Sequence, residues 1–277
     1  MSRLLTLLQD GARPVIGMVQ LPALPGSSRY QGGSLSEVLK TAMAETQALV
    51  GVGVDALIVQ NLGDLPVDHK ATHAQVAWMT RACAWVAEEA QVPVGLNFLE
   101  NDVEAMFACA SAAELDFVRI KVFVGVMITP SGAESGAAFR AQKARHDLRA
   151  ERQIAILADV HDRTGVPLGG RAIDEDIREA VDLGGADALV LTGSNFEESM
   201  EYLATGKRKS PHTPRVLGGS ATASNIRQVF QVADGAIVSS SLKDSGSAFG
   251  KIDPIKAGEF MEAVRIARTE VGAEMTK

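Results

Sequence analysis

The chain has 277 residues, 46% of them hydrophobic and 22% charged, and its formal net charge is −7 at pH 7. The acidic balance and the lack of a basic run argue against nucleic acid as a partner. The sequence has no apolar run of the ~18 residues that a membrane-spanning helix needs and no signal-peptide pattern, so we expect a cytoplasmic protein without a transmembrane segment.

Apolar runs of strand length alternate with helical patterns along the sequence. In chain order we expect strand 15–19, helix 34–51, strand 55–60, helix 72–90, strand 93–98, a helix from 101, strand 116–122, helix 137–152, strand 154–159, helix 173–183, strand 188–191, strand 216–217, a helix from 224, strand 235–238 and a helix from 253. Ser34 with Glu37, and Asn101 with Glu104, have the spacing of capping boxes.

Each expected strand is almost entirely apolar, which is typical of parallel strands covered on both faces. Eight βα units within the length of one domain favour a closed barrel over an open doubly wound sheet. The sequence therefore predicts a single (β/α)₈ TIM barrel that spans residues 1–277.

The last two expected strands end in turns of small residues, at 218–220 and 239–241. In a (β/α)₈ barrel, phosphate-binding turns characteristically follow strands seven and eight. Exposed N–H groups and hydroxyls would bind the phosphate, helped by the N-terminus of a helix that Ser224 caps. The residues predicted to bind phosphate are Gly219, Ser220, Ser239 and Ser240. The alternative is that they only fill tight turns.

Polar side chains stand at the C-terminal ends of the expected strands, where barrel enzymes carry their chemistry. Amide and hydroxyl groups there are predicted to orient the hydroxyl and carbonyl groups of a substrate. These residues are Gln60, Asn61, Asn97 and Thr192.

Arg119 and Lys121 are two residues apart on one expected strand, so their side chains point to the same face. In the barrel they would face an anionic or carbonyl substrate, and a desolvated Lys121 could form a Schiff base. The alternative is that they form ion pairs, with Asp159 among others, that only pack the barrel.

Asp159 and His161 have the same two-residue spacing at the end of the next strand. They are predicted to be catalytic with Arg119 and Lys121, as a general acid/base pair. One alternative is that they are two ligands of a divalent metal; no other metal or cofactor is predicted. Another is that Asp159 caps a loop and His161 lies exposed at the rim.

Seven segments resemble the BtpA/SgcQ family, in the same order and over nearly the whole chain. They are MVQLPALPGS (18–27), VQNLGDLP (59–66), LNFLENDVEA (96–105), FVRIKVF (117–123), ILADVH (156–161), GGSATASNI (218–226) and ADGAIVSSSLK (233–243). The resemblance implies a (β/α)₈ barrel with a phosphate-type site. Its motif positions here are Asn61, Asp64, Asn97, Asn101, Asp102, Asp159 and His161.

The family's name implies a role in photosystem I assembly, whereas other members look like sugar-metabolism proteins. We therefore expect an isomerase or lyase that acts on a small phosphorylated molecule, such as a sugar phosphate. The alternative is a non-catalytic factor in membrane-complex biogenesis, with a peripheral membrane or assembly partner. A homo-oligomer is among the expected forms.

Overall fold

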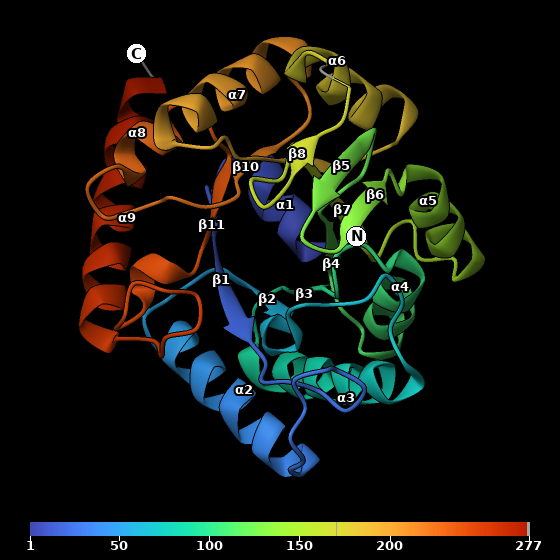
Figure 1. Cartoon of the computed structure of the whole chain (residues 1–277). Helices are drawn as coiled ribbons and strands as arrows, with labels where there is room; N and C mark the ends of the chain where they lie inside the picture. Colours follow the sequence, from blue (N-terminus) through green and yellow to red (C-terminus); the bar gives the residue numbers. More distant parts are fainter. Residues whose placement is uncertain (170, 276–277) are drawn as a thin grey trace.

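The computed structural model describes residues 1–169 and 171–275. Parallel strands close into a barrel in the order β1-β11-β10-β9-β7-β4-β3-β2 (Figure 1). They are β1 (Val15–Gln20), β2 (Ala56–Gln60), β3 (Val94–Asn97), β4 (Phe117–Ile120), β7 (Ala155–Val160), β9 (Ala188–Leu191), β10 (Arg215–Leu217) and β11 (Gly235–Val238). The predicted (β/α)₈ barrel is therefore confirmed.

Helices surround the barrel (Figure 1). They are α2 (Leu35–Gly51), α3 (His73–Ala90), α4 (Val103–Ala112), α5 (Ala138–Asp147), α6 (Ile173–Arg178) with its π-helical continuation η2 (Glu179–Leu183), α7 (Phe196–Lys209), α8 (Ile226–Phe230) and α9 (Pro254–Met275). In the part of the chain that the structure describes, no helix combines the length and the apolar character that crossing a membrane requires.

The capping predictions were half right. Ser34 and Glu37 form the expected capping box at the start of α2. At α4 the cap is Asp102 rather than Asn101. The Asn101 amide is used elsewhere, because its Nδ2 donates to the carbonyl oxygens of Val122 at 2.9 Å and Ser135 at 3.2 Å.

Several elements were not predicted from the sequence. Helix α7 occupies the connection between β9 and β10, and α1 (Arg3–Gln9) precedes the first strand. The loops that follow β4 and β7 form a small antiparallel sheet. Its strands are β5 (Val126–Thr129), β6 (Gly132–Ser135) and β8 (Val166–Pro167).

Apolar side chains fill the lumen of the barrel below its carboxyl end. They form one cluster that includes Ile58, Phe117 and Leu157 from the strands and Leu4 and Leu8 from α1. Figure 1 shows α1 near the barrel axis, where it covers the N-terminal opening. The packed lumen confines polar chemistry to the carboxyl end, which is where a (β/α)₈ barrel carries its site.

The close packing of the lumen depends on a glycine in β3. A Cβ atom at Gly95 would lie 2.4 Å from the ring of Phe117 on the neighbouring strand. Only glycine lets that ring approach the backbone of β3 so closely.

Helix α9 packs on the outside of the barrel through the predicted stripe of Phe260, Val264, Ala267 and Val271, all of them buried.

We expect Phe260→Ala to lower the free energy of unfolding by about 3–5 kcal/mol, because it leaves a cavity in a close-packed core. Urea denaturation of the purified chain measures this. The matched control is Phe139→Ala on α5, where the ring is 79% exposed and the expected change is below about 0.5 kcal/mol. Similar losses in the two variants would contradict the assigned packing of α9.

Candidate functional site

A cavity of about 210 Å³ lies at the carboxyl end of the barrel. It is lined by the ends of several strands and by the loops that follow β2, β3, β7, β9, β10 and β11. The predicted site residues that line it are Gln60, Asn61, Arg119, Lys121, Thr192, Gly219, Ser220, Ser239 and Ser240. Asn97, Asp159 and His161 are not part of its lining.

Arg119 and Asp159 form a buried ion pair between the neighbouring strands β4 and β7. The guanidinium donates from Nε and Nη2 to the two carboxylate oxygens, at 2.9 and 2.6 Å. The side chains are 11% and 2% exposed, respectively. Because Arg119 lines the cavity and Asp159 does not, the carboxylate lies behind the guanidinium. The expected ion pair is therefore present, and it forms one wall of the cavity.

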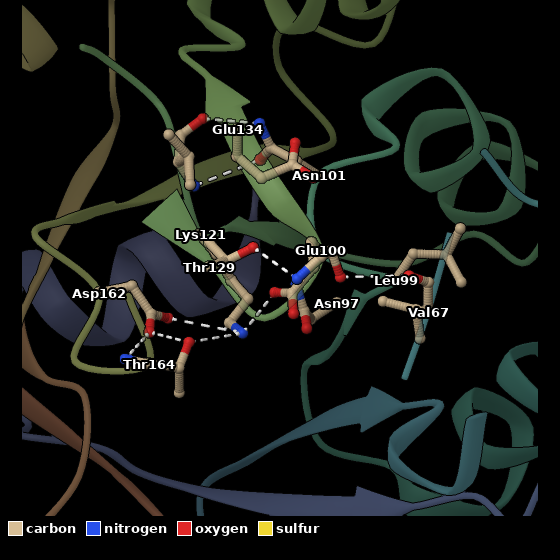
Figure 2. Close-up of polar contacts among 12 residues, drawn as sticks. Val67, Asn97, Leu99, Glu100, Asn101, Lys121, Thr129, Glu134, Asp162 and Thr164 are labelled. Carbon is tan, nitrogen blue, oxygen red and sulfur yellow. Dashed lines mark hydrogen bonds and ion pairs between the residues drawn. The ribbon is translucent and has the colours of Figure 1, made fainter. Parts of the chain in front are cut away.

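Lys121 lies just beyond β4 and lines the same cavity as Arg119. Its Nζ donates to Glu100 Oε2 at 2.7 Å and to Thr164 Oγ1 at 3.1 Å, and it lies 3.8 Å from Asp162 Oδ2 (Figure 2). Burial disfavours the ammonium, but the carboxylates of Asp162 and Glu100 outweigh it and raise the pKa of Lys121 above its usual value. Lys121 is therefore an ammonium ion at neutral pH.

A chain of amide hydrogen bonds runs across the ends of β1 to β4. Asn97 Nδ2 donates to the backbone carbonyl of Arg119 at 3.0 Å, and Gln60 Nε2 donates to Asn97 Oδ1 at 2.8 Å. Gln20 Nε2 donates in turn to Gln60 Oε1 at 3.2 Å. The backbone carbonyl of Arg119 can only accept, so it determines which atom donates and which accepts in each of these hydrogen bonds. Gln20 Oε1 remains as a buried acceptor that has no partner among the described residues.

The same chain explains why Asn97 does not line the cavity. It is fully buried, and its amide is used in holding Gln60 and the end of β4.

Asn61 shapes the loop that carries Glu100. It is 2% exposed, its Oδ1 accepts from the backbone N–H of Leu99 at 3.0 Å, and its Nδ2 donates to Asp64 at 2.8 Å. Leu99 has a φ of +54°, an uncommon conformation for a large side chain. The bond from Asn61 holds this strained turn, which places Glu100 beside Lys121.

The two small-residue turns lie together on the cavity wall. A Cβ atom at Gly218 would lie 2.2 Å from Thr192 Oγ1, so the turn after β10 packs closely against the end of β9. The hydroxyl oxygens of Thr192 and Ser239 are buried and have no hydrogen-bond partner among the described residues. A buried polar atom without a partner is uncommon and costs stability unless a water or a ligand satisfies it.

One part of the phosphate prediction was wrong. Helix α8 begins at Ile226, has only five residues, and has no side-chain cap, so Ser224 does not cap it. The turn at 218–220 is therefore not followed by a helix that Ser224 caps. Its hydrogen-bonding groups are backbone N–H groups and hydroxyls alone.

His161 has other partners than Asp159. Its φ of +60° turns the chain out of the strand, although both residues line a second, smaller cavity. Nε2 lies 2.7 Å from Asp176 Oδ2 on α6, and the ring stands edge-on to Tyr202 of α7. The imidazole is thus held by helices outside the barrel, while Asp159 is bonded to Arg119.

The cavity also contains charged and polar residues that were not predicted as part of the site: Glu100, Asp162, Arg163 and Thr164. They stand a few positions beyond the ends of the expected strands, in the FLEND and HDRT segments. A search limited to the last residues of each expected strand does not include these four residues. A cluster of polar residues directly after a strand was the available signal.

The sequence matches one family of proteins over most of its length. The model of the BtpA family matches residues 11–266. The chain is 36% identical to the photosystem I biogenesis protein BtpA of Synechocystis sp., over 91% of this chain and 88% of that protein. It is 26% identical to the putative sgc region protein SgcQ of Escherichia coli K12, over 92% of this chain and 96% of that protein.

Among solved structures, the N-(5'-phosphoribosyl)anthranilate isomerase of Pyrococcus furiosus matches with a TM-score of 0.55 at 15% identity, covering 92% of this chain and 99% of that one. This likeness concerns the fold. The family match extends over nearly the whole barrel and the segments that build its cavity, and on that ground the chain belongs to the BtpA family.

Proposed function

We propose that this protein is an enzyme that binds a small phosphorylated metabolite, such as a sugar phosphate, and moves a proton on it in an isomerase-type reaction. The observation that carries the proposal is the cavity itself, which joins two small-residue turns to a buried group of charges. The solved isomerase with the same fold acts on a phosphoribosyl compound, as its name states, and this agrees with the proposal.

The turns suit a phosphate because they offer donors that nothing else uses. Among the described residues, the backbone N–H groups of Gly219 and Ser220 have no acceptor. The hydroxyls of Thr192 and Ser239 are equally free of partners. N–H groups of a small-residue turn can approach phosphate oxygens closely, which a bulkier turn would prevent.

The charged group suits proton transfer rather than a Schiff base. An amine must lose its proton to attack a carbonyl, and the carboxylates around Lys121 keep it protonated. As an ammonium it can stabilise the negative charge that develops on a substrate oxygen. This argues against a lyase that forms an imine and favours an isomerase.

Two carboxylates are candidates for the base. Asp159 was predicted for this role, but it lies behind Arg119 and would have to act through it. Glu100 lines the cavity directly and is hydrogen-bonded to Lys121. A base must reach the proton that it removes, so Glu100 is the better candidate, with Asp159 supporting Arg119.

A second candidate function is a non-catalytic role in membrane-complex biogenesis. The observation in its favour is the name of the Synechocystis relative. On this hypothesis the cavity has lost its ligand, and no phosphorylated compound would bind there. The ligand-binding experiment below therefore distinguishes the two functions.

Gly219→Asp should weaken a phosphorylated ligand by at least tenfold, because it places a carboxylate at close range to an anion. Calorimetric titration with a panel of sugar phosphates measures the affinity. The matched control is Gly258→Asp on α9, which adds the same charge where a Cβ atom meets nothing within 4 Å. Unchanged affinity in Gly219→Asp would show that the turn does not bind the phosphate, and a wild type that binds no compound would favour the biogenesis role.

Glu100→Gln should leave sugar-phosphate binding nearly unchanged and slow proton transfer by about 10²-fold, the usual effect of losing a general base. Incorporation of deuterium from D₂O next to the carbonyl of aldose and ketose phosphates, followed by NMR, measures that step. Glu89→Gln, at an exposed position on α3, is the matched control. Equal rates in Glu100→Gln and the wild type would exclude Glu100 as the base.

Burial raises the pKa of Asp159 to about 6, although Arg119 and Lys121 favour its carboxylate form. Because the pKa is higher in the folded state, protonation of Asp159 stabilises the fold. This stabilisation is complete at a pH below the usual pKa of an aspartate and is lost as the pH rises through about 6. The free energy of unfolding of the wild type minus that of Asp159→Asn should therefore fall between pH ~4 and pH ~7. Denaturant titrations at several pH values measure it. A difference that grows with pH would mean that Arg119 outweighs burial.

A further inference from the structure

Most charges in and behind the cavity are already balanced by one another. Arg119 is neutralised by the buried Asp159, which it binds through two hydrogen bonds. Lys121 is paired with Glu100, and Asp162 lies 3.8 Å from both cations. These groups comprise two cations and three carboxylates, so they offer an incoming anion no net positive charge.

Arg163 is the exception. It lines the cavity and is exposed, and no carboxylate lies within ion-pair distance of it among the described residues. Its Nη1 donates to Ser220 Oγ at 3.3 Å. Its guanidinium also lies against Gly219, since a Cβ atom there would be 3.2 Å from Cζ. The unpaired cation is thus in contact with the turn whose N–H groups have no acceptor.

The loop after β7 is built to hold Arg163 in this place. Asp162 Oδ1 accepts from the backbone N–H of Thr164 at 2.6 Å and from its hydroxyl at 2.5 Å, and the N–H of Gly165 donates to the carbonyl of Asp162 at 3.1 Å. The other carboxylate oxygen of Asp162 faces Lys121 and Arg119. This tight turn directs the Arg163 side chain across the end of β9 to the turn after β10.

We propose that Arg163 is the charge partner of the ligand's phosphate and that the site selects phosphate monoesters whose remaining part is uncharged. This inference rests on the proposed function. The planar guanidinium would bind two phosphate oxygens while Gly219 and Ser220 bind from the other side. A second anionic group on the ligand would meet Glu100 and Asp162, so it is disfavoured.

A buried acceptor adds to the specificity. Gln20 is the last residue of the amide chain that begins at the Arg119 carbonyl, and its Oε1 has no donor among the described residues. It calls for a donor on the ligand, which a hydroxyl provides and a carboxylate does not. The ligand class is therefore a hydroxylated phosphate monoester.

The test compares two probes in calorimetric titrations, glycerol 1-phosphate and 3-phosphoglycerate, which differ chiefly in a carboxylate. The wild type should bind glycerol 1-phosphate more tightly. Arg163→Gln should weaken its binding by about 10- to 100-fold, as loss of charge-assisted hydrogen bonds does. The affinity of Arg163→Lys for glycerol 1-phosphate should lie between those of the wild type and Arg163→Gln, because lysine keeps the positive charge but lacks the paired N–H donors of the guanidinium.

The matched control is Arg152→Gln. Arg152 is an exposed arginine that precedes β7, and Arg163 follows it, so the same charge is removed at the opposite end of the barrel. Its affinities should equal those of the wild type. Urea denaturation verifies that each variant is folded.

Three results would overturn the inference, and they are distinguishable. If the wild type binds glycerol 1-phosphate and Arg163→Gln binds it equally well, Arg163 is not the charge partner, although the proposed function stands. If the wild type binds 3-phosphoglycerate as tightly as glycerol 1-phosphate, selection for an uncharged remainder is wrong. Failure of the wild type to bind either probe or any sugar phosphate would remove the proposed function and this inference together.

Discussion

The carboxyl end of this barrel depends on one buried ion pair, that of Arg119 with Asp159. Bringing two charges onto an apolar lumen costs free energy, and the two hydrogen bonds between the guanidinium and the carboxylate offset part of that cost. Removing one partner of such a pair typically costs about 3–5 kcal/mol. The pair marks the level at which the hydrophobic filling of the barrel ends and the polar cavity begins.

The remaining polar groups are organised around that pair. Asn97 is fixed by the backbone carbonyl of Arg119, Gln60 by Asn97, and Gln20 by Gln60. Few of these groups are free to rotate, so the cavity is shaped before any ligand arrives. Such preorganisation lowers the entropy lost on binding and is a general property of sites that carry chemistry.

The sequence was sufficient to predict the barrel because its signal is repeated in every strand, and an error in one unit does not change the fold. The polar residues at the strand ends were found for the same reason, since period-two alternation places Arg119 and Lys121 on the face that lines the lumen. Loop residues have no such periodicity. The turn of the chain at His161 was not predicted, because a positive φ at a residue other than glycine has only a weak sequence signature.

Glu100 and Arg163 were missed for a related reason. The position of Glu100 depends on a turn that Asn61 holds from a distant part of the chain, and Arg163 comes to the cavity through a contact with Ser220, which is also distant in the sequence. The helix expected at 101 was displaced by one residue because the Asn101 amide bonds to carbonyls more than twenty positions away. A local sequence pattern indicates a capping box, but it contains no information about contacts with distant parts of the chain.

Helix α1 limits how a ligand can enter and leave the barrel. Leu4 and Leu8 are 0% and 2% exposed in the lumen cluster, and Arg3 ties the helix to Asp116 before β4. Among the described residues, the barrel is therefore closed by α1 at its N-terminal end, and the cavity lies at its carboxyl end. Whatever enters the cavity must leave by the route it came, so a product has to depart before the next molecule can arrive.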